Sequence, residues 1–262
     1  MRRLHTFCRY GIFFVGAALL GACSGTPTYN PTVFPASIDQ ARLDAHPMKT
    51  VVIAHVNLGS QSRNYLKKEA PRIDAQVTEY LRDNGFTVLP QREFEQHWNT
   101  AVRAFGNPVD PTSGKVNTKT FAQIMHRVRD ELAESSNIDG FIFTDLVEVQ
   151  ESFSGGMKHL ARWDGVTRAP TMQGPGDGVS ASFDWSMMAA MVSLKVTIYD
   201  AELKPVFHGR GGIDATDAID SRSTKGRYIR RRNILENESN IMEGIQLAFY
   251  PLIAMEDWPG NP

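Results

Sequence analysis

The sequence predicts an α/β (α+β) fold in which helices pack on a mixed β-sheet that ends in an antiparallel hairpin. Short β-branched runs alternate with segments whose apolar residues recur every three or four positions, so strands and helices follow one another along the chain. The clearest strand, residues 188–199, alternates apolar and polar side chains and therefore has one buried face. A turn at 200–205 leads into a second run at 206–209, which indicates a hairpin.

The elements that precede this hairpin follow the order strand, helix, strand, helix, helix, strand. In each helix the apolar residues fall on one face because of their spacing. Gly85 is suited to end the first helix, and a last helix is expected from about Asn233 after the hairpin. The predicted strands are 50–56, 86–89 and 141–149, and the apolar helical faces lie within 66–81, 94–105 and 118–132.

The first residues have the three parts of a secretory signal. Arg2 and Arg3 supply a cationic start, an apolar run follows at 11–20, and small residues come next. The run is about half of the ~20 residues that a membrane-spanning helix needs. Residues 1–22 are therefore predicted to be a cleaved signal peptide.

The end of this segment, Leu20-Gly21-Ala22-Cys23, resembles the bacterial lipobox. The resemblance implies that Cys23 carries a covalent diacylglycerol and an N-acyl lipid, and no other cofactor is predicted. Ser24 stands where an inner-membrane retention signal would have Asp, which favours the periplasmic face of the outer membrane. Cys8 leaves with the signal, so no disulfide is available to the mature chain.

Three regions are predicted after the signal. Residues 23–47 contain the lipidated cysteine and four spaced prolines, and they are expected to form a semi-extended tether with neither helix nor sheet pairing. Residues 48–256 form a single α/β domain. A Gly-rich insertion at about 152–186 interrupts it, with a β-ribbon expected near 160–166 and a mobile loop at 174–178.

The motifs of common enzyme classes are absent. The chain has neither two His one helical turn apart with a Glu between them nor a Ser-x-x-Lys or Gly-x-Ser-x-Gly motif. Residues 112–115 imitate a nucleophile motif without a companion, and His55 is interpreted as a histidine of a buried strand. The formal net charge of −1 gives no electrostatic footprint for nucleic acid. A non-enzymatic role is therefore predicted.

Two further patterns have structural explanations. The glycines in Gly209-Arg210-Gly211-Gly212 are expected to mark a β-bulge or the exit of the hairpin, because no helix start follows that would complete a phosphate site. Asp214, Asp217 and Asp220 have a spacing that does not match an EF-hand loop. We interpret them as a solvated acidic loop in preference to a calcium site.

The run from 227 to 232 is the most conspicuous cluster of charge in the chain. It precedes the predicted last helix, where cations oppose the helix dipole. Two interpretations stay open: a solvated loop, or a contact with anionic lipid, with peptidoglycan, or with the acidic face of another protein. Two tryptophans of the insertion are added to the candidate partner-binding residues, which are Arg227, Tyr228, Arg230, Arg231, Arg232, Trp163 and Trp185.

The pattern of elements resembles a group of periplasm-facing bacterial lipoproteins. The group includes the curli-secretion-channel lipoproteins, the outer-membrane activators of penicillin-binding proteins, and the amino-terminal domain of the Tol-system propeller protein. The segments that carry the resemblance are Val51 to Val56, Gly85 to Leu89 with Glu93 and Phe94, Ile138 to Ile142, and Val192 to Asp200 with Val206 to Gly209. The insertion at 152–186 departs from the pattern. The resemblance implies a non-enzymatic role in assembling or activating an envelope machine.

Two functions follow as hypotheses. The favoured one is a membrane-anchored subunit or accessory factor of a cell-envelope complex, which binds other envelope proteins or copies of itself. The alternative is an envelope hydrolase or a small-ligand-binding lipoprotein that uses the 152–186 loops, with Trp163, Asp164, Trp185 and His159 near a pocket. An exposed apolar or basic patch would indicate the first. His159 or His208 beside a carboxylate in a cleft would indicate the second.

Overall fold

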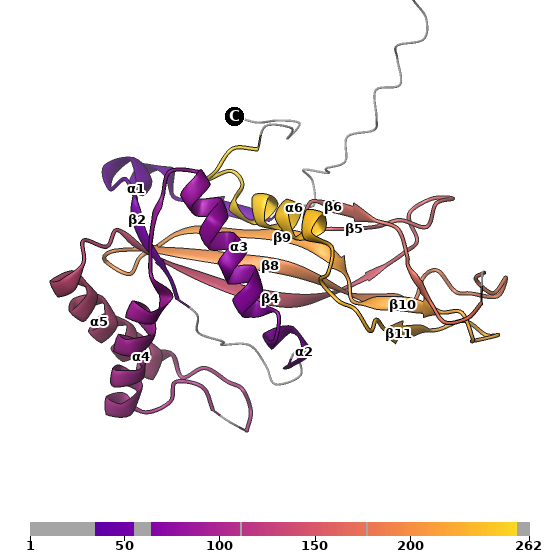
Figure 1. Ribbon diagram of the computed structural model, residues 1–262, viewed down its shortest axis with the longest axis horizontal. Coiled ribbons are helices and arrows are strands. Elements are labelled where there is room, and N and C mark those ends of the chain that lie inside the picture. Colours follow the sequence, from indigo (N-terminus) through magenta and orange to yellow (C-terminus); the bar gives the residue numbers. More distant parts are fainter. Residues whose placement is uncertain (1–34, 55–63, 111, 177, 256–262) are drawn as a thin grey trace, which may run out of the picture.

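The computed structural model describes residues 35–54, 64–110, 112–176 and 178–255, which form a mixed six-stranded sheet with helices on both faces and two smaller sheets (Figure 1). The predicted α/β fold is therefore confirmed. The strands are β1 (Ala36–Ile38), β2 (Thr50–Ile53), β3 (Thr87–Leu89), β4 (Gly140–Ser152), β5 (Ala161–Trp163), β6 (Val166–Arg168), β7 (Met172–Gln173), β8 (Met188–Asp200), β9 (Pro205–Ala215), β10 (Asp217–Asp220) and β11 (Tyr228–Arg230). The helices are α1 (Gln40–Ala45), α2 (Asn64–Lys67), α3 (Ala70–Asp83), α4 (Gln91–Phe105), α5 (Thr118–Ser135) and α6 (Glu238–Phe249).

The main sheet has the order β1-β9-β8-β4-β2-β3. β2 is parallel to β3 and to β4, whereas β4, β8, β9 and β1 pair antiparallel. β4 and β8 each have 13 residues and pair along their whole length, from Gly140 opposite Asp200 to Ser152 opposite Met188. At about 3.4 Å per residue this ladder is roughly 40 Å long. It therefore extends from the helices at one end of the molecule to the small sheets at the other.

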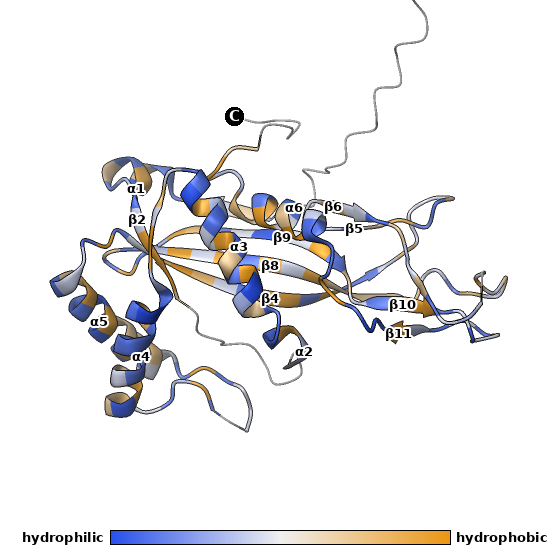
Figure 2. Cartoon of the chain, in the orientation of Figure 1, coloured by the Kyte–Doolittle hydropathy of each residue, from blue (hydrophilic) through white to orange (hydrophobic). Residues whose placement is uncertain are grey.

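Each face of the sheet is covered by different helices. Val192, Leu194, Val196 and Ile198 of β8 lie on one face and are buried in the core that includes α3 and α6. On the other face, α4 and α5 cover β2 and β4, where the rings of Phe94 and Phe141 meet edge to face with centroids 6.5 Å apart. Figure 2 shows the hydrophobic residues concentrated along these inner strands and hydrophilic residues on the outer sides of α4 and α5.

The predicted tether is wrong over its last part. Residues 36–45 form β1 and α1, and β1 pairs antiparallel with β9, with Ala36 opposite Gly209. This stretch has no proline, and it covers what would otherwise be an open edge of β9. The side chain of Asp39 then accepts from the amide of Arg42 and caps α1. The folded domain consequently begins before residue 48.

Other boundaries also differ from the predictions. The last helix begins at Glu238 and not near Asn233, because Asn237 caps it by accepting from the amide of Asn240. The ribbon near 160–166 is confirmed as β5 and β6, joined by Asp164 and Gly165 at φ 39° and 86°. The signal, Cys23 and His55 lie outside the described residues. None of the helices within the described ranges is long and apolar enough to cross a membrane.

Gly209 and Gly211 lie where β9 meets α6, whereas Gly212 faces Trp163 and Val166 of the β5–β6 ribbon. β9 runs on to Ala215, further than predicted, and its register with β8 shifts between Val192 and Ser193, so the expected bulge is present. A Cβ added at Gly211 would overlap the carbonyl oxygen of Gly244 on α6 and lie 2.7 Å from the amide nitrogen of Ala248. The absence of a side chain at Gly211 therefore lets the helix approach the strand.

We expect Gly211→Ala to destabilise the protein by about 3 kcal/mol, because a methyl group at this position forces backbone apart in a packed core. Urea unfolding followed by circular dichroism measures the change. Gly178→Ala is the matched control, since Gly178 is exposed and an added Cβ there meets nothing within 4 Å. Equal stability of the two variants would contradict the close packing of α6 on β9.

Candidate functional site

The basic run is part of a small sheet at the far end of the β4–β8 ladder. β11 pairs antiparallel with β10, and β10 pairs parallel with β7, which gives the order β11-β10-β7. Together with the insertion this sheet forms the distal lobe, residues 153–187 and 217–232, at the end of the molecule opposite α5 (Figure 1). The run therefore contains a strand, and the helix that was expected to follow it directly starts several residues later.

Pairing of β10 with β11 places Asp217 and Asp220 against arginines of the basic run, and Asp214 at the end of β9 meets a third. Ion pairs join Asp220 to Arg227 at 2.8 Å, Asp217 to Arg230 at 3.4 Å, and Asp214 to Arg231 at 2.8 Å. The prediction of a solvated acidic loop is wrong, because Asp214 and Asp220 are buried. A buried carboxylate needs such partners to offset its loss of hydration.

Asp220 has the fullest set of partners among the three acids. One of its oxygens accepts from Nε of Arg227 at 2.9 Å and from Nη2 at 2.8 Å, and the other accepts from the amide of Arg222 at 3.1 Å. The bond from Arg227, followed by that from the Arg222 amide, lowers the pKa of Asp220 below its ordinary value of 3.8. The carboxylate is therefore charged at neutral pH and holds the β10–β11 turn closed.

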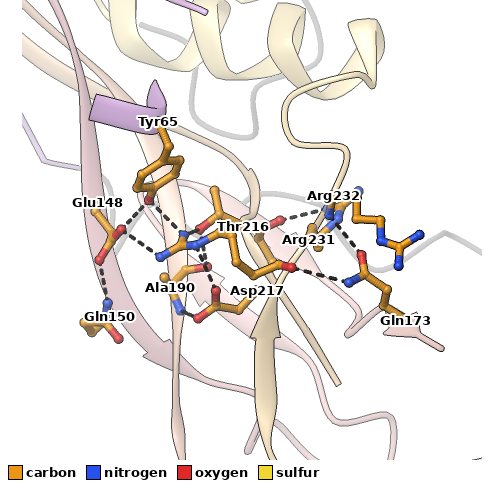
Figure 3. A network of polar contacts seen from close by, with 11 residues as sticks. Tyr65, Glu148, Gln150, Gln173, Ala190, Thr216, Asp217, Arg231 and Arg232 are labelled. Carbon is orange, nitrogen blue, oxygen red and sulfur yellow. Dashed lines mark hydrogen bonds and ion pairs between the residues drawn. The ribbon is translucent and has the colours of Figure 1, made fainter. Parts of the chain in front are cut away.

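Arg230 is the centre of a polar network that ties the distal lobe to the main sheet, and Figure 3 labels its partners Tyr65, Glu148, Thr216 and Asp217. Its Nη1 donates to the hydroxyl of Tyr65 at 2.8 Å and also to Thr216, and its guanidinium lies 4.2 Å from the centre of the Tyr65 ring. Tyr65 in turn donates to Glu148, which also pairs with Arg230 at 3.4 Å. Burial and the bond to Glu148 raise the pKa of Tyr65 to about 12, so the hydroxyl keeps its proton. Asp217 pairs with Arg230 through its Oδ1 atom, and its Oδ2 atom accepts from the amide of Ala190 at 2.9 Å.

Arg232 differs from the other arginines of the run. Its amide donates to Oε1 of Gln173 at 2.9 Å, and Nε2 of that side chain donates to the carbonyl of Arg230 at 3.4 Å (Figure 3). Within the part of the chain that the structure describes, its exposed guanidinium forms no ion pair. It borders an open pocket of about 300 Å³, called here the distal pocket and lined by Thr171, Met172, Gln173, Ala218, Arg231, Arg232 and Asn233.

The two tryptophans proposed for partner binding have different positions. Trp163 is 3% exposed, and its Nε1 donates to the carbonyl of Val192 at 3.4 Å. It is therefore a core residue and not part of a binding surface. Trp185 is half-buried and stacks on His159 with ring centroids 3.6 Å apart, and Phe183 connects it to Tyr228. Trp185 and Tyr228 thus belong to one aromatic cluster of the distal lobe.

The residues named for the hydrolase alternative do not place a described histidine beside a carboxylate. His159 stacks on Trp185, and Nδ1 of His208 lies 3.2 Å from Oγ1 of Thr197. Among the described residues neither histidine has a carboxylate partner, and Asp164 instead accepts from the hydroxyl of Ser193 at 2.6 Å. The same residues contain no group of three or more His, Cys, Asp or Glu that could hold a metal ion. The described groups therefore provide no acid–base pair at this position.

A sequence signal for the paired charges does exist. The three acids at 214, 217 and 220 and the three arginines at 227, 230 and 231 have nearly mirrored spacing about the turn at 221–226, as an antiparallel pair requires. Tyr65, Glu148 and Gln173 have no comparable signal, because they come from distant parts of the chain. Comparisons with protein-family models, curated proteins and solved structures give no match.

We expect Asp220→Asn to lower the thermal midpoint at pH 7 and to have a smaller effect at pH 3 than at pH 7. The pKa of Asp220 is depressed in the folded state, so its stabilisation is present above the ordinary carboxyl pKa of 3.8 and is lost as the pH falls through the folded pKa. Thermal unfolding at pH 7, 5 and 3 measures the difference. Asp83→Asn, at the exposed end of α3, is the control. A midpoint difference that does not change with pH would refute the role given to the Asp220 charge.

Proposed function

We propose that this chain is a lipid-anchored, non-enzymatic subunit or accessory factor of a cell-envelope complex, on the periplasmic face of the outer membrane. Its distal lobe would carry the surface that contacts the partner. The observation that supports this most is that the arginines of the basic run differ in whether they form an ion pair. Three arginines are paired with buried or half-buried acids, while Arg232 is exposed beside the distal pocket.

The paired arginines contribute rigidity to this surface. Because Arg227, Arg230 and Arg231 already have carboxylate partners, a ligand would have to break those pairs to use them. Because the ion pairs already hold β10 and β11 in one conformation, less conformational entropy is lost when a partner binds to this surface. The contact itself is therefore assigned to exposed groups that form no ion pair among the described residues, with Arg232 suited to a carboxylate or phosphate of the partner.

Exposed methionines surround the same end of the molecule. Among the described residues, the large exposed hydrophobic side chains are Phe105, Met157, Met172 and Met188, and Met157 is 99% exposed. Met157 and Met172 belong to the distal lobe, and Met188 begins β8 at its border. Flexible thioether side chains adapt to irregular apolar surfaces. An apolar contact beside an exposed arginine is typical of a protein interface.

For the anchor, we expect Cys23→Ala to move the protein from the membrane fraction to the soluble fraction. Without acyl chains it loses membrane affinity of about 0.8 kcal/mol for each buried CH₂ group. Ultracentrifugation of cell lysates followed by immunoblotting measures the distribution. Cys8→Ala is the matched control, because Cys8 lies within the predicted signal. Continued membrane association of the Cys23 variant alone would exclude the lipid anchor.

For the partner surface, we expect photo-crosslinks to form from the distal lobe. Benzoylphenylalanine is introduced in living cells in place of Met172 or Arg232, and in place of Glu79, an exposed residue of α3, as the control. Adducts from the first two positions are identified by mass spectrometry. A ladder of self-adducts indicates a homo-oligomeric subunit, and one dominant foreign protein indicates an accessory factor. Adducts that are absent, or equally abundant from Glu79, would contradict the proposal.

A further inference from the structure

A strip of the main sheet lies between its two coverings on the face that α5 occupies. The β5–β6 ribbon covers the distal part, where Asp164 accepts from Ser193 and from the amide of Gly212. α5 packs over β4 and reaches Phe143 and Tyr199. Between these coverings four side chains are half-buried, namely Lys195, Thr197, His208 and Arg210.

An apolar groove runs from α5 onto this strip. One cavity of about 200 Å³ is lined mainly by apolar side chains, including Met125 of α5 and Leu203 of the β8–β9 turn. A second cavity of about 160 Å³ has both Lys195 and Asp145 in its lining. The two cavities share Phe121, Phe143 and Tyr199 as walls, so they are neighbours on one surface, called here the α5 groove. The groove is mainly apolar at the Leu203 end, and its other end is lined by one cation and one acid.

Lys195 and Asp145 line the groove, and Arg210 lies next to Lys195 on the neighbouring strand, so this row of charges has one more cation than acids. Strand register places Asp145 opposite Lys195 and Lys195 opposite Arg210, so one acid and two cations form a row across three strands. Two like charges directly opposite on neighbouring strands destabilise a sheet. His208 responds to the same cations, since burial and then the charges of Lys195 and Arg210 lower its pKa. An anion at this position would relieve the repulsion.

We propose that the α5 groove binds a single-chain amphiphile, with its alkyl chain against Phe121, Phe143 and Tyr199 and its carboxylate on Lys195 and Arg210. Tyr199 and Lys195 are four residues apart on β8, which corresponds to about 13 Å. A chain of roughly ten carbons, with bonds of about 1.5 Å, has this length. A peptide strand is disfavoured because β4 and β8 are both paired on both sides and offer no edge to extend.

This site is separate from the surface assigned to a protein partner. The partner surface is assigned to the β7, β10 and β11 end of the distal lobe, which joins the main sheet near Ala190. Along β8, Lys195 at the nearer end of the groove is five residues, or about 17 Å, from Ala190, and Tyr199 at the apolar end is nine residues, or about 30 Å, away. Failure of amphiphile binding would therefore leave the proposed partner surface untouched, and the reverse holds as well.

Isothermal titration with decanoate, below its micellar concentration, tests the proposal. The full-length Cys23→Ala chain is used so that no attached lipid competes. We expect saturable binding that becomes at least tenfold weaker in the double variant Lys195→Met, Arg210→Met, which keeps side-chain length but removes both charges. Ala122→Trp, at an exposed position that lines the groove, should block the alkyl chain to a similar degree. Lys119→Met, exposed on the same helix, is the control and should bind as the parent does.

Three results would overturn the proposal. The first is an unchanged decanoate affinity in the double variant and in Ala122→Trp, with circular dichroism confirming that both are folded. The second is equally tight binding of decyltrimethylammonium, which has the same chain and the opposite charge. The third is no binding of decanoate together with binding of an acidic peptide that carries one aromatic side chain, which would assign the groove to a protein segment.

Discussion

The antiparallel pairing of β4 with β8 is the constraint on which the rest of the structure depends. These two strands are the central pair of the main sheet, with β2 and β3 on one side and β9 and β1 on the other. They also extend past the helices, and there Glu148 of β4 contacts Arg230 while the amide of Ala190 on β8 binds Asp217. One continuous ladder thus positions both the helical core and the distal lobe, and a one-residue slip would reverse every side chain that either end uses.

The sequence predicted the sheet well because its core strands follow simple periods. Alternation between residues 188 and 199 predicted the strand and the face that is buried from Val192 to Ile198, but Met188 is exposed, and Ala189, Met191 and Ser193 of the opposite face are buried as well. Helical spacing located α3, α4 and α5 to within a few residues. The proline-based prediction of a tether was wrong over residues 36–45, since pairing with the edge of β9 depends on a strand far away in the chain. Trp163 was misplaced although β5 alternates buried Ala161 with exposed Arg162, a period that indicates a core residue.

The candidate site was only half visible in the sequence for a related reason. The acidic run at 214–220 and the basic run at 227–232 are each, taken alone, typical of a solvated loop. Their mirrored spacing about the turn at 221–226 carries the information that they pair. The α5 groove has no such local pattern, because Phe121, Phe143 and Lys195 come from three elements that only the fold brings together. Periodicity in the sequence indicates local secondary structure, so it does not show which distant residues meet through tertiary packing.

The edge strand β1 has a mechanical consequence under the proposed anchoring. Tension from a lipid on Cys23 would reach the domain at Ala36, and the first hydrogen bonds to bear it would be those of β1, a strand of three residues, to β9. Behind it, α1 has no buried residues and is held to the domain by the ion pair of Arg42 with Asp200 and by Leu43, which packs against the main core. Detachment of β1 and α1 would lengthen the tether by some ten residues, or about 30 Å, while β2 stays paired in the interior of the sheet. Under tension, β1 would therefore detach before the core unfolds, and the domain could then extend further from the membrane.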